Sequence, residues 1–362
     1  MPKILVCANS FPPSLGGIAT YASQLAHCLS KLNFDVTVLA PALAGHKAFD
    51  AKAEYRIVRY SSKLCLYISW LLKSFNMDMI FIVQRGNYLT LAYYLNKLMT
   101  KPYVVAAHGH ELTTKKLRAI VKKLNGSSAV IPVSSYTAKH FLSIGVDPSL
   151  INMINNGSAL IQENNLEIRE KYKLQNKLII LTVARLIKHK GQDKLIQALP
   201  AILKEIPNTH YLIAGDGPDK GYLETLVAQE NLTNHVTFTG AISNEELASC
   251  YYACDLFAMI SRQHNGSIEG FGIAFLEAGS AGKAVIGGNS GGIPDAVEHN
   301  VTGVLVDPEN IDAISMVVTE LLKQEKKRTR LGLNGKQRVM NEFTWEKVAN
   351  KYATLFERIL KA

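Results

Sequence analysis

The chain has few of the residues that hold small disulfide-rich folds or structural metal sites together. Its 362 residues include five cysteines, and no two of them form a C-x2-C pair. An odd number without paired spacing argues against a disulfide framework and against a cysteine-based zinc site. Cys250 and Cys254 fall one helical turn apart in an apolar stretch, so we expect both to be core residues.

Long apolar runs and an apolar leader are also lacking. The longest obvious apolar run, Leu64 to Leu72, is nine residues, far short of the ~20 that span a bilayer. Met1-Pro2-Lys3 leads directly into an expected strand, without the apolar region of a signal peptide. We therefore expect a cytoplasmic protein.

Two further absences concern ligands. No DxD triplet occurs in the chain, so a divalent-metal clamp on phosphates is not supported and we expect no metal or other cofactor. Fixed cations and backbone dipoles would then stabilise a phosphate. The first glycine-containing loop, Asn9 to Gly17, lacks the G-x-G-x-x-G spacing of a dinucleotide site, which disfavours a nicotinamide cofactor.

Positive charge is concentrated in the first part of the chain. Residues 1–165 hold 17 Lys and Arg against 7 Asp and Glu, a net charge of +10, whereas residues 166–362 hold 23 of each. This asymmetry favours an anionic partner, either a membrane surface or an acidic acceptor. Nucleic acid is not supported, because no aromatic-interleaved basic motif or helix-turn-helix pattern is present.

Strand-like and helix-like segments alternate along the chain, which at this length can form two domains. The alternation predicts α/β domains with parallel, doubly wound sheets. The polar segment from Asn155 to Leu166 is the expected linker, dividing the chain into residues 1–160 and 161–344. The expected strands are Lys3–Ala8, Val36–Leu39, Arg56–Arg59, Met79–Val83, Tyr103–Ala107, Ala129–Val133, Leu178–Val183, His210–Ala214, Val236–Thr239, Asp255–Ile260 and Ala284–Gly287.

The stretch SRQHNGSIEGFGIAFLEAGSAGKAVIGGNSGGIPD, Ser261 to Asp295, sets two carboxylates around a glycine turn. Seven residues separate Glu269 from Glu277, and we expect the first on a loop and the second one turn into a helix that opens near Ile273. Such a helix start presents backbone N–H groups and a positive dipole end that suit a diphosphate. Taken singly, each glutamate is more readily explained as a solvated or locally paired side chain.

Two other clusters follow expected strands, at the sheet edge where ligands bind. Arg185 and Lys190 follow the strand at Leu178–Val183 and could neutralise a diphosphate, although each alone would be an ordinary surface charge. His108 begins HGHE after the strand at Tyr103–Ala107. This cluster can be interpreted as a zinc site lacking its third ligand, as a structural feature, or as part of a catalytic cleft.

These motifs, in this order, resemble those of family 4 of the retaining, nucleotide-sugar-dependent glycosyltransferases, with its E-x7-E motif and GT-B fold. The resemblance covers nearly the whole chain. It implies two Rossmann-like, doubly wound domains facing a central cleft, with the donor held mainly by the second and the acceptor by the first. It also implies that a final amphipathic helix, residues 345–362, crosses back to the first domain.

The resemblance assigns roles to individual residues. The catalytic set is His108, Arg185, Lys190 and Glu269, with His108 and Glu269 near the donor sugar and the two cations on the diphosphate. The donor-binding set is Gly16, Gly17, Ile242, Gly270, Phe271, Gly272, Ile273 and Glu277. In that set Glu277 binds the nucleotide ribose, backbone near Ile242 meets the base, and Gly16 and Gly17 approach the donor phosphate.

Within the family, the motifs of this chain look most similar to those of the phosphatidylinositol mannosyltransferase-like members. The motifs that carry this similarity are FPPxxGGI, HGHE, KGQDxLIxALP and the residues before EGFGI. They favour a mannosyl group from GDP-mannose, with a UDP-sugar as the other donor, and a glycan or lipid acceptor. The NGVD-like turn of many members is here Asn156-Gly157-Ser158-Ala159, so any role of that aspartate is absent. The competing hypotheses are a nucleotide-sugar epimerase, which needs carboxylates that the first domain largely lacks, and a non-catalytic sugar- or anion-binding module.

The segment from Thr113 to Asn125, TTKKLRAIVKKLN, places apolar residues on one helical face and five cations on the other. A solvated surface is the default interpretation of such a pattern. Together with the charge asymmetry, it also fits peripheral contact with an anionic membrane at its inner, cytoplasmic face, or with an acidic acceptor.

Overall fold

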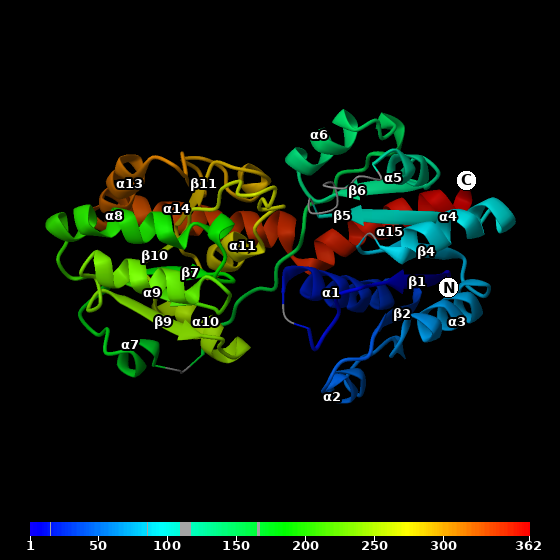
Figure 1. Ribbon diagram of the computed structural model, residues 1–362, viewed down its shortest axis with the longest axis horizontal. Helices are drawn as coiled ribbons and strands as arrows, with labels where there is room; N and C mark the ends of the chain where they lie inside the picture. Colours follow the sequence, from blue (N-terminus) through cyan, green and yellow to red (C-terminus); the bar gives the residue numbers. More distant parts are fainter. Residues whose placement is uncertain (15, 85, 109–116, 165–166) are drawn as a thin grey trace. The chain divides into compact units, whose positions relative to one another are not determined.

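The structure is a computed structural model that describes the whole chain except residues 15, 85, 109–116 and 165–166. It divides into two compact units (Figure 1). The first comprises Met1–Gly157 together with Trp345–Ala362, and the second comprises Ser158–Thr344. Both units are α/β with a parallel sheet, as predicted from the alternation of strands and helices.

The first unit has a six-stranded sheet in the order β3-β2-β1-β4-β5-β6, with every paired strand parallel. Apolar runs such as KILVC and MIFI are typical of strands that helices cover on both faces. Its strands are β1 (Lys3–Cys7), β2 (Asp35–Pro41), β3 (Arg56–Tyr60), β4 (Met79–Ile82), β5 (Tyr103–Ala107) and β6 (Ala129–Pro132).

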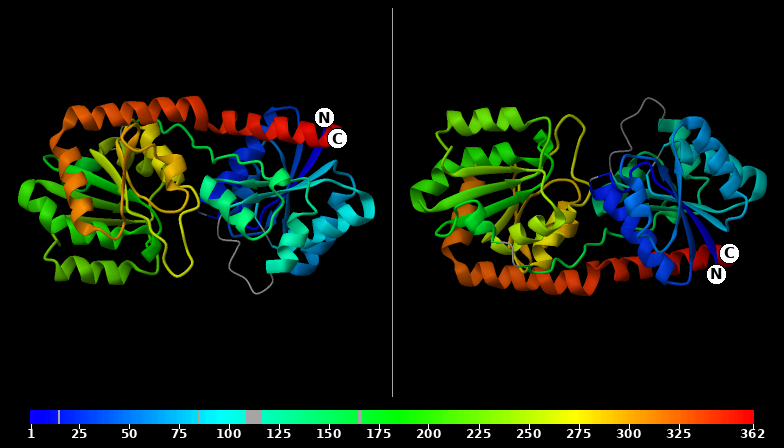
Figure 2. Two further views of the ribbon diagram at one scale, coloured as in Figure 1. Left: turned by 90° about the horizontal axis from the view of Figure 1, so that it is seen from above. Right: turned by 90° about the horizontal axis from the view of Figure 1, so that it is seen from below.

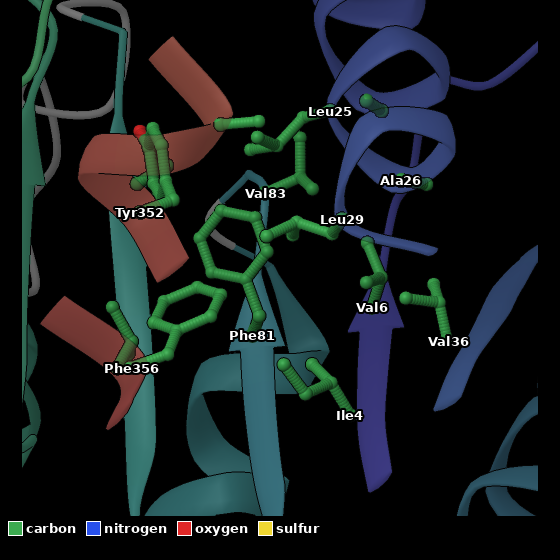
Figure 3. Close-up of a cluster of buried hydrophobic side chains, with 14 of the residues drawn as sticks. Ile4, Val6, Leu25, Ala26, Leu29, Val36, Phe81, Val83, Tyr352 and Phe356 are labelled. Carbon is green, nitrogen blue, oxygen red and sulfur yellow. The ribbon is translucent and has the colours of Figure 1, made fainter. Parts of the chain in front are cut away.

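The two faces of this sheet are covered by different helices. Alternate residues of a strand point to opposite faces, so Phe81 joins the core under α1 and α15, and Ile80 joins the core under α3 and α4. Figure 3 shows Phe81 packed with Leu29 of α1 and Phe356 of α15. The helices are α1 (Gly17–Lys31), α2 (His46–Asp50), α3 (Lys63–Ser74), α4 (Asn87–Met99), α5 (Leu117–Leu124), α6 (Ser135–Ser143), the 3-10 turn η2 (Pro148–Leu150) and α15 (Trp345–Lys361).

The C-terminal helix α15 is part of the first unit's core. Its buried residues Val348, Ala349, Tyr352 and Phe356 follow helical spacing, so one face of the helix is apolar. That face packs along α1, where the hydroxyls of Tyr21 and Tyr352 lie 2.6 Å apart. In Figure 2, α15 is the red helix that ends at the C-terminus.

The second unit has a six-stranded parallel sheet in the order β12-β11-β10-β7-β8-β9. Its core includes Leu256 and Ala258 of β10 together with α8 and α13, whereas Phe257 packs on Phe275 of α11. The strands are β7 (Leu178–Val183), β8 (Thr209–Ala214), β9 (Val236–Gly240), β10 (Leu256–Met259), β11 (Val285–Gly288) and β12 (Gly303–Val306). The helices are α7 (Ile168–Lys171), η3 (Lys188–Lys190), α8 (Gln192–Glu205), α9 (Lys220–Gln229), α10 (Asn244–Ala253), α11 (Ile273–Ser280), α12 (Ile293–Ala296), α13 (Ile311–Lys323), α14 (Glu325–Arg338) and η4 (Val339–Phe343).

Several local expectations can be compared with these elements. Cys250 and Cys254 are buried, as predicted. Of the expected basic helix, Leu117–Leu124 forms α5, whereas Thr113 to Lys116 lie outside the described residues. Within the described part of the chain, no helix combines the length and apolar character needed to cross a membrane.

Candidate active site

The loops that follow β7, β10 and β11 come together at one edge of the second sheet. These three strands are neighbours and parallel, so their carboxyl ends lie at the same edge, where ligands bind in sheets of this kind. The loop after β7 carries Arg185 and Lys190, and the loop after β10 carries Glu269. The predicted cations and the predicted carboxylate therefore come from adjacent strands.

A glycine fixes the loop after β7 against the end of β10. Gly191 has a φ of +74°, and a Cβ built on it would lie 1.9 Å from the carbonyl oxygen of Ile260. Any other residue would collide with backbone that cannot give way, and would be strained at this φ. Gly191 thus allows the close approach that places Lys190 beside the loop after β10.

Lys190 and Glu269 form an ion pair between these two loops. Both side chains are mostly buried, with 17% and 14% of their surface exposed. The structure therefore brings together two residues of the predicted catalytic set that are 79 positions apart in the sequence. Arg185 is exposed in the same loop as Lys190, and its carbonyl oxygen accepts a hydrogen bond from the Gln192 amide at 3.0 Å.

The glycines after β11 hold the backbone of Glu269. The Gly292 N–H donates to the Glu269 carbonyl oxygen at 3.0 Å. A Cβ on Gly291, whose φ is +58°, would lie 2.3 Å from that same oxygen. Only glycine allows this approach, which gives the Ser290-Gly291-Gly292 turn a physical reason.

Helix α11 begins where the sequence predicts, at Ile273. Its N-cap is Gly272, with a φ of +94°, and no side chain caps the first N–H groups. Gly270 and Phe271 are buried, and the Phe271 ring packs 5.9 Å from that of Phe343. The turn therefore presents backbone donors at the positive end of the helix dipole, a setting that favours an anion.

Glu277 is the fifth residue of α11 and is held by a tyrosine that the sequence analysis did not single out. The Tyr251 hydroxyl, from α10, donates to Glu277 Oε2 at 2.7 Å. Burial raises the pKa of Glu277, and the hydrogen bond from Tyr251 partly opposes that rise. The sequence signal for Tyr251 was its place beside Cys250, in a stretch expected to be buried, because a buried tyrosine usually finds a partner for its hydroxyl.

Glu277 is the residue predicted to accept the ribose hydroxyls of the donor nucleotide. On that prediction we expect Tyr251→Phe to weaken binding of a nucleoside diphosphate, with GDP as the probe, by about tenfold at neutral pH, because a hydrogen bond to a charged group contributes ~1.5–3 kcal/mol. The variant raises the pKa of Glu277 further, and an ionised carboxylate is the better acceptor for ribose hydroxyls. Affinity that needs the carboxylate is lost as pH falls through this pKa, so the loss should begin at a higher pH in the variant. Calorimetric titration of GDP across pH measures both effects.

The matched control is Tyr252→Phe. The neighbouring Tyr252 hydroxyl donates its hydrogen bond to the Ile161 carbonyl oxygen at 3.0 Å, and not to Glu277. Its pH profile for GDP binding should follow the wild type. A Tyr251→Phe profile that coincides with the wild type would show that the tyrosine does not act through Glu277.

A buried ion pair that the sequence analysis did not predict lies close to Lys190. The Arg262 guanidinium, in the loop after β10, forms two hydrogen bonds with the Asp193 carboxylate of α8, at 2.8 and 2.7 Å. Both side chains are 8% exposed. The Arg262 N–H also donates to the His189 carbonyl oxygen at 2.9 Å, one residue before Lys190. This pair ties the two site loops together.

The remaining donor-site prediction in the second unit is Ile242. It is half-buried in the connection between β9 and α10. The Ser243 hydroxyl that follows it caps α10 by accepting from the Glu246 N–H at 3.2 Å. The Glu246 carboxylate does not complete a capping box with Ser243, because it pairs with Lys171 and Tyr172.

Three predicted residues belong to the first unit. His108 follows β5 and is buried; its Nε2 donates to the Val83 carbonyl at 3.0 Å, and its ring meets that of Tyr21 edge-on. Gly16 is the N-cap of α1 with a φ of +133°, and Gly17 is the first helical residue. Gly109, His110 and Glu111 of the HGHE motif lie outside the described residues. Among residues that are described, no three His, Cys, Asp or Glu side chains are grouped so that they could hold a metal.

Both halves of the chain match known glycosyltransferase families. The family "Glycosyl transferases group 1" matches residues 164–338, and "Glycosyltransferase Family 4" matches residues 15–159. The chain is 32% identical to the GDP-mannose-dependent alpha-(1-6)-phosphatidylinositol monomannoside mannosyltransferase of Mycobacterium tuberculosis, over 98% of this chain and 97% of the relative. Its counterpart in Mycolicibacterium smegmatis is 29% identical, over 97% of each chain.

Solved structures show the same architecture. Anabaena Alr3699/HepE, in complex with UDP and glucose, superposes with a TM-score of 0.85 at 22% identity, over 99% of this chain and 100% of that one. Sucrose-phosphate synthase from Thermosynechococcus elongatus superposes with a TM-score of 0.79 at 21% identity, over the full length of both chains. At these identities the likeness concerns the fold.

Proposed function

The chain belongs to family 4 of the glycosyltransferases and has the GT-B fold, and from this we propose that it transfers a mannosyl group from GDP-mannose to a hydroxyl of a lipid-linked acceptor. Transfer proceeds with retention at the anomeric carbon and without a metal ion. The relatives that are 32% and 29% identical to this chain are named for GDP-mannose and for a phosphatidylinositol monomannoside, which supports both the donor and the class of acceptor.

The observation that carries this proposal is the ion pair between Lys190 and Glu269 in the same loop cluster as the uncapped start of α11. A mostly buried cation beside free backbone donors suits a diphosphate, and a carboxylate beside them suits the hydroxyls of a sugar. When the donor binds, a diphosphate oxygen replaces Glu269 as the partner of Lys190. The Glu269 carboxylate can then accept hydrogen bonds from the hydroxyls of the mannosyl group.

The reaction requires no enzyme nucleophile. The bond between the anomeric carbon and the diphosphate oxygen breaks, and the acceptor oxygen bonds to the same face of that carbon. The acceptor's proton passes to the departing diphosphate, whose developing charge is stabilised by Arg185, Lys190 and the N-terminus of α11. The effective dielectric constant of a partly buried site is lower than that of water, so these charge interactions are stronger there than they are in water.

The other predicted residues complete the donor site. Glu277, held by Tyr251, accepts the ribose hydroxyls, and backbone near Ile242 meets the base. In the first unit, His108 contacts the donor sugar, and the backbone of Gly16 and Gly17 approaches the donor phosphate. The acceptor binds to the first unit.

The test is a transfer assay with GDP-mannose, UDP-glucose and ADP-glucose, using detergent-solubilised phosphatidylinositol lipids as acceptors, in EDTA and with added Mg²⁺ or Mn²⁺. We expect labelled mannose in the lipid, with an α-linkage by NMR, and equal rates in EDTA. Turnover that is lost in EDTA and restored by metal would contradict the metal-free mechanism. Binding without either transfer or donor hydrolysis would indicate a non-catalytic binding module.

The two glutamates should differ in what they bind. We expect Glu277→Ala to weaken free GDP, because hydrogen bonds from ribose hydroxyls to a carboxylate are worth ~1.5–3 kcal/mol each. Glu269→Ala should leave GDP affinity unchanged or improve it, since the change frees Lys190 from its ion pair, while weakening productive binding of GDP-mannose. Calorimetry with GDP and with GDP-mannose compares them. Equal losses of GDP affinity in both variants would contradict this division of roles.

A further inference from the structure

The Arg59 side chain, near the end of β3, joins three segments of the first unit. Its guanidinium donates to the Pro12 carbonyl oxygen at 2.7 Å and to the Pro41 carbonyl oxygen at 2.9 Å. It also forms an ion pair with the Asp50 carboxylate at 2.6 Å, and 8% of the Arg59 side chain is exposed. A guanidinium presents its N–H groups in a rigid planar fork, so one side chain can hold several acceptors in a fixed arrangement.

Pro12 lies in the loop between β1 and α1, which leads to Gly16 and Gly17. Pro12 and Pro13 have no backbone N–H, so neither can donate a hydrogen bond to neighbouring backbone. This part of the loop therefore depends on its carbonyl oxygens and on side-chain packing to keep its course. Arg59 supplies a mostly buried donor to one of those oxygens.

Phe11 anchors the loop beside that contact. Its side chain is fully buried, and the Arg59 guanidinium lies over its ring, with Cζ 5.3 Å from the ring centre. The Phe49 ring of α2 meets the Phe11 ring edge-on, with centroids 5.7 Å apart. Both kinds of contact stabilise beyond the burial of apolar area. Arg59 thus holds two successive residues of the loop, one by a hydrogen bond and one by packing.

Helix α2 provides the counter-charge for Arg59. Its five residues are all described and none of them is buried, and a helix this short has little stability of its own. Its last residue is Asp50, whose Oδ2 accepts from Arg59 Nε at 3.2 Å while Oδ1 accepts from Nη2 at 2.6 Å. A paired contact of this kind fixes the plane of the guanidinium. The Asp50 carboxylate therefore sets the direction in which Arg59 reaches Pro12.

We propose that Arg59 is a positioning residue of the donor site, which holds the β1–α1 loop so that the backbone of Gly16 and Gly17 meets the donor diphosphate. Arg59 does not touch the donor, because its N–H groups are turned to two carbonyl oxygens and a carboxylate. The inference rests on the proposed function, in which the backbone of Gly16 and Gly17 approaches the phosphate. It adds that the shape of this loop is set from β3 and α2, which lie outside the FPPxxGGI motif.

The experiment measures the affinity of the full chain for GDP by calorimetry, together with thermal unfolding. We expect Arg59→Ala to bind GDP about tenfold more weakly, because backbone donors that have lost their set position form poorer charge-assisted hydrogen bonds with the phosphate. Arg59→Lys should bind as weakly, since an ammonium keeps the charge but cannot reproduce the planar fork. Arg56→Ala removes an exposed arginine of the same strand and should bind like the wild type.

Ile57→Ala is the control for stability. Ile57 also belongs to β3 and packs against the core of the first unit, so its truncation lowers the unfolding temperature. Its GDP affinity should nevertheless equal that of the wild type, because the contacts of Arg59 remain. Should Arg59→Ala fail to fold, Asp50→Asn decides, since Asp50 is 24% exposed and the change leaves a neutral acceptor in place. We expect Asp50→Asn to lose about threefold in GDP affinity, because a neutral acceptor holds the guanidinium less firmly.

Wild-type GDP affinity in Arg59→Ala would overturn the proposal, and where that variant does not fold, so would wild-type affinity in Asp50→Asn. A loss of GDP affinity in Ile57→Ala as large as that in Arg59→Ala would also overturn it, because Arg59 would then act through stability alone. Failure of the proposed function is distinguishable. A wild type that binds GDP but transfers no mannose would contradict the transfer reaction and leave the comparison of GDP affinities intact.

Discussion

Lys190→Ala and Arg185→Ala should each lower kcat for mannosyl transfer by about 10²-fold or more. Removing one group that stabilises charge appearing in a transition state typically costs ~2.7–4 kcal/mol. Lys190 is mostly buried and pairs with the Glu269 carboxylate, so its charge is less screened than that of a surface lysine. Steady-state rates at saturating GDP-mannose measure the effect.

Lys188→Ala provides the matched control. Lys188 lies in the same short turn, η3, but it is exposed and its ammonium lies 4.8 Å from the centre of the Tyr222 ring. If net positive charge near the site were sufficient, all three variants would lose activity alike; we expect only Lys190→Ala and Arg185→Ala to do so. An unchanged kcat with a raised KM would mean that the cations serve ground-state binding and not the transition state.

The elements of the site could be predicted from local sequence, because each carries a local signal. Glycine turns and apolar runs placed Glu269 on a loop, and placed Glu277 one turn into a helix that begins at Ile273. The apolar runs predicted β7, β8 and β9 to within a residue or two. Strand β12 (Gly303–Val306) was not predicted from the sequence.

The partnerships within the site could not be predicted, because they depend on which strands are neighbours. Lys190 meets Glu269 since β7 and β10 lie side by side in the sheet. Tyr251 meets Glu277 since α10 and α11 pack near the same strand, where the Phe257 ring lies 5.9 Å from that of Tyr251 and 5.5 Å from that of Phe275. Sequence periodicity reports which face of an element is buried, not which side chain of another element it will meet.

The other large effect concerns stability, at the buried pair that ties the site loops together. Asp193→Ala should lower the free energy of unfolding of the second unit by about 3–5 kcal/mol, because it leaves a buried guanidinium without its two hydrogen bonds. Arg262 retains Glu309 at 3.4 Å, but that carboxylate is 59% exposed and compensates little. Glu309→Ala, which removes this exposed partner, should cost at most about 1 kcal/mol.

The measurement must report on the second unit alone. Both tryptophans, Trp70 and Trp345, belong to the first unit, so the urea transition seen by tryptophan fluorescence should not move in Asp193→Ala. Hydrogen exchange of peptides from β7 and α8 should become faster, by the factor that corresponds to the lost free energy. Asp193→Leu/Arg262→Met should restore slow exchange, because replacing both partners of a buried pair by apolar residues is often neutral or stabilising. Equal exchange in Asp193→Ala and Glu309→Ala would show that the buried pair contributes no more than a surface contact, and the loops that carry Lys190 and Glu269 would then owe their positions to the glycine contacts alone.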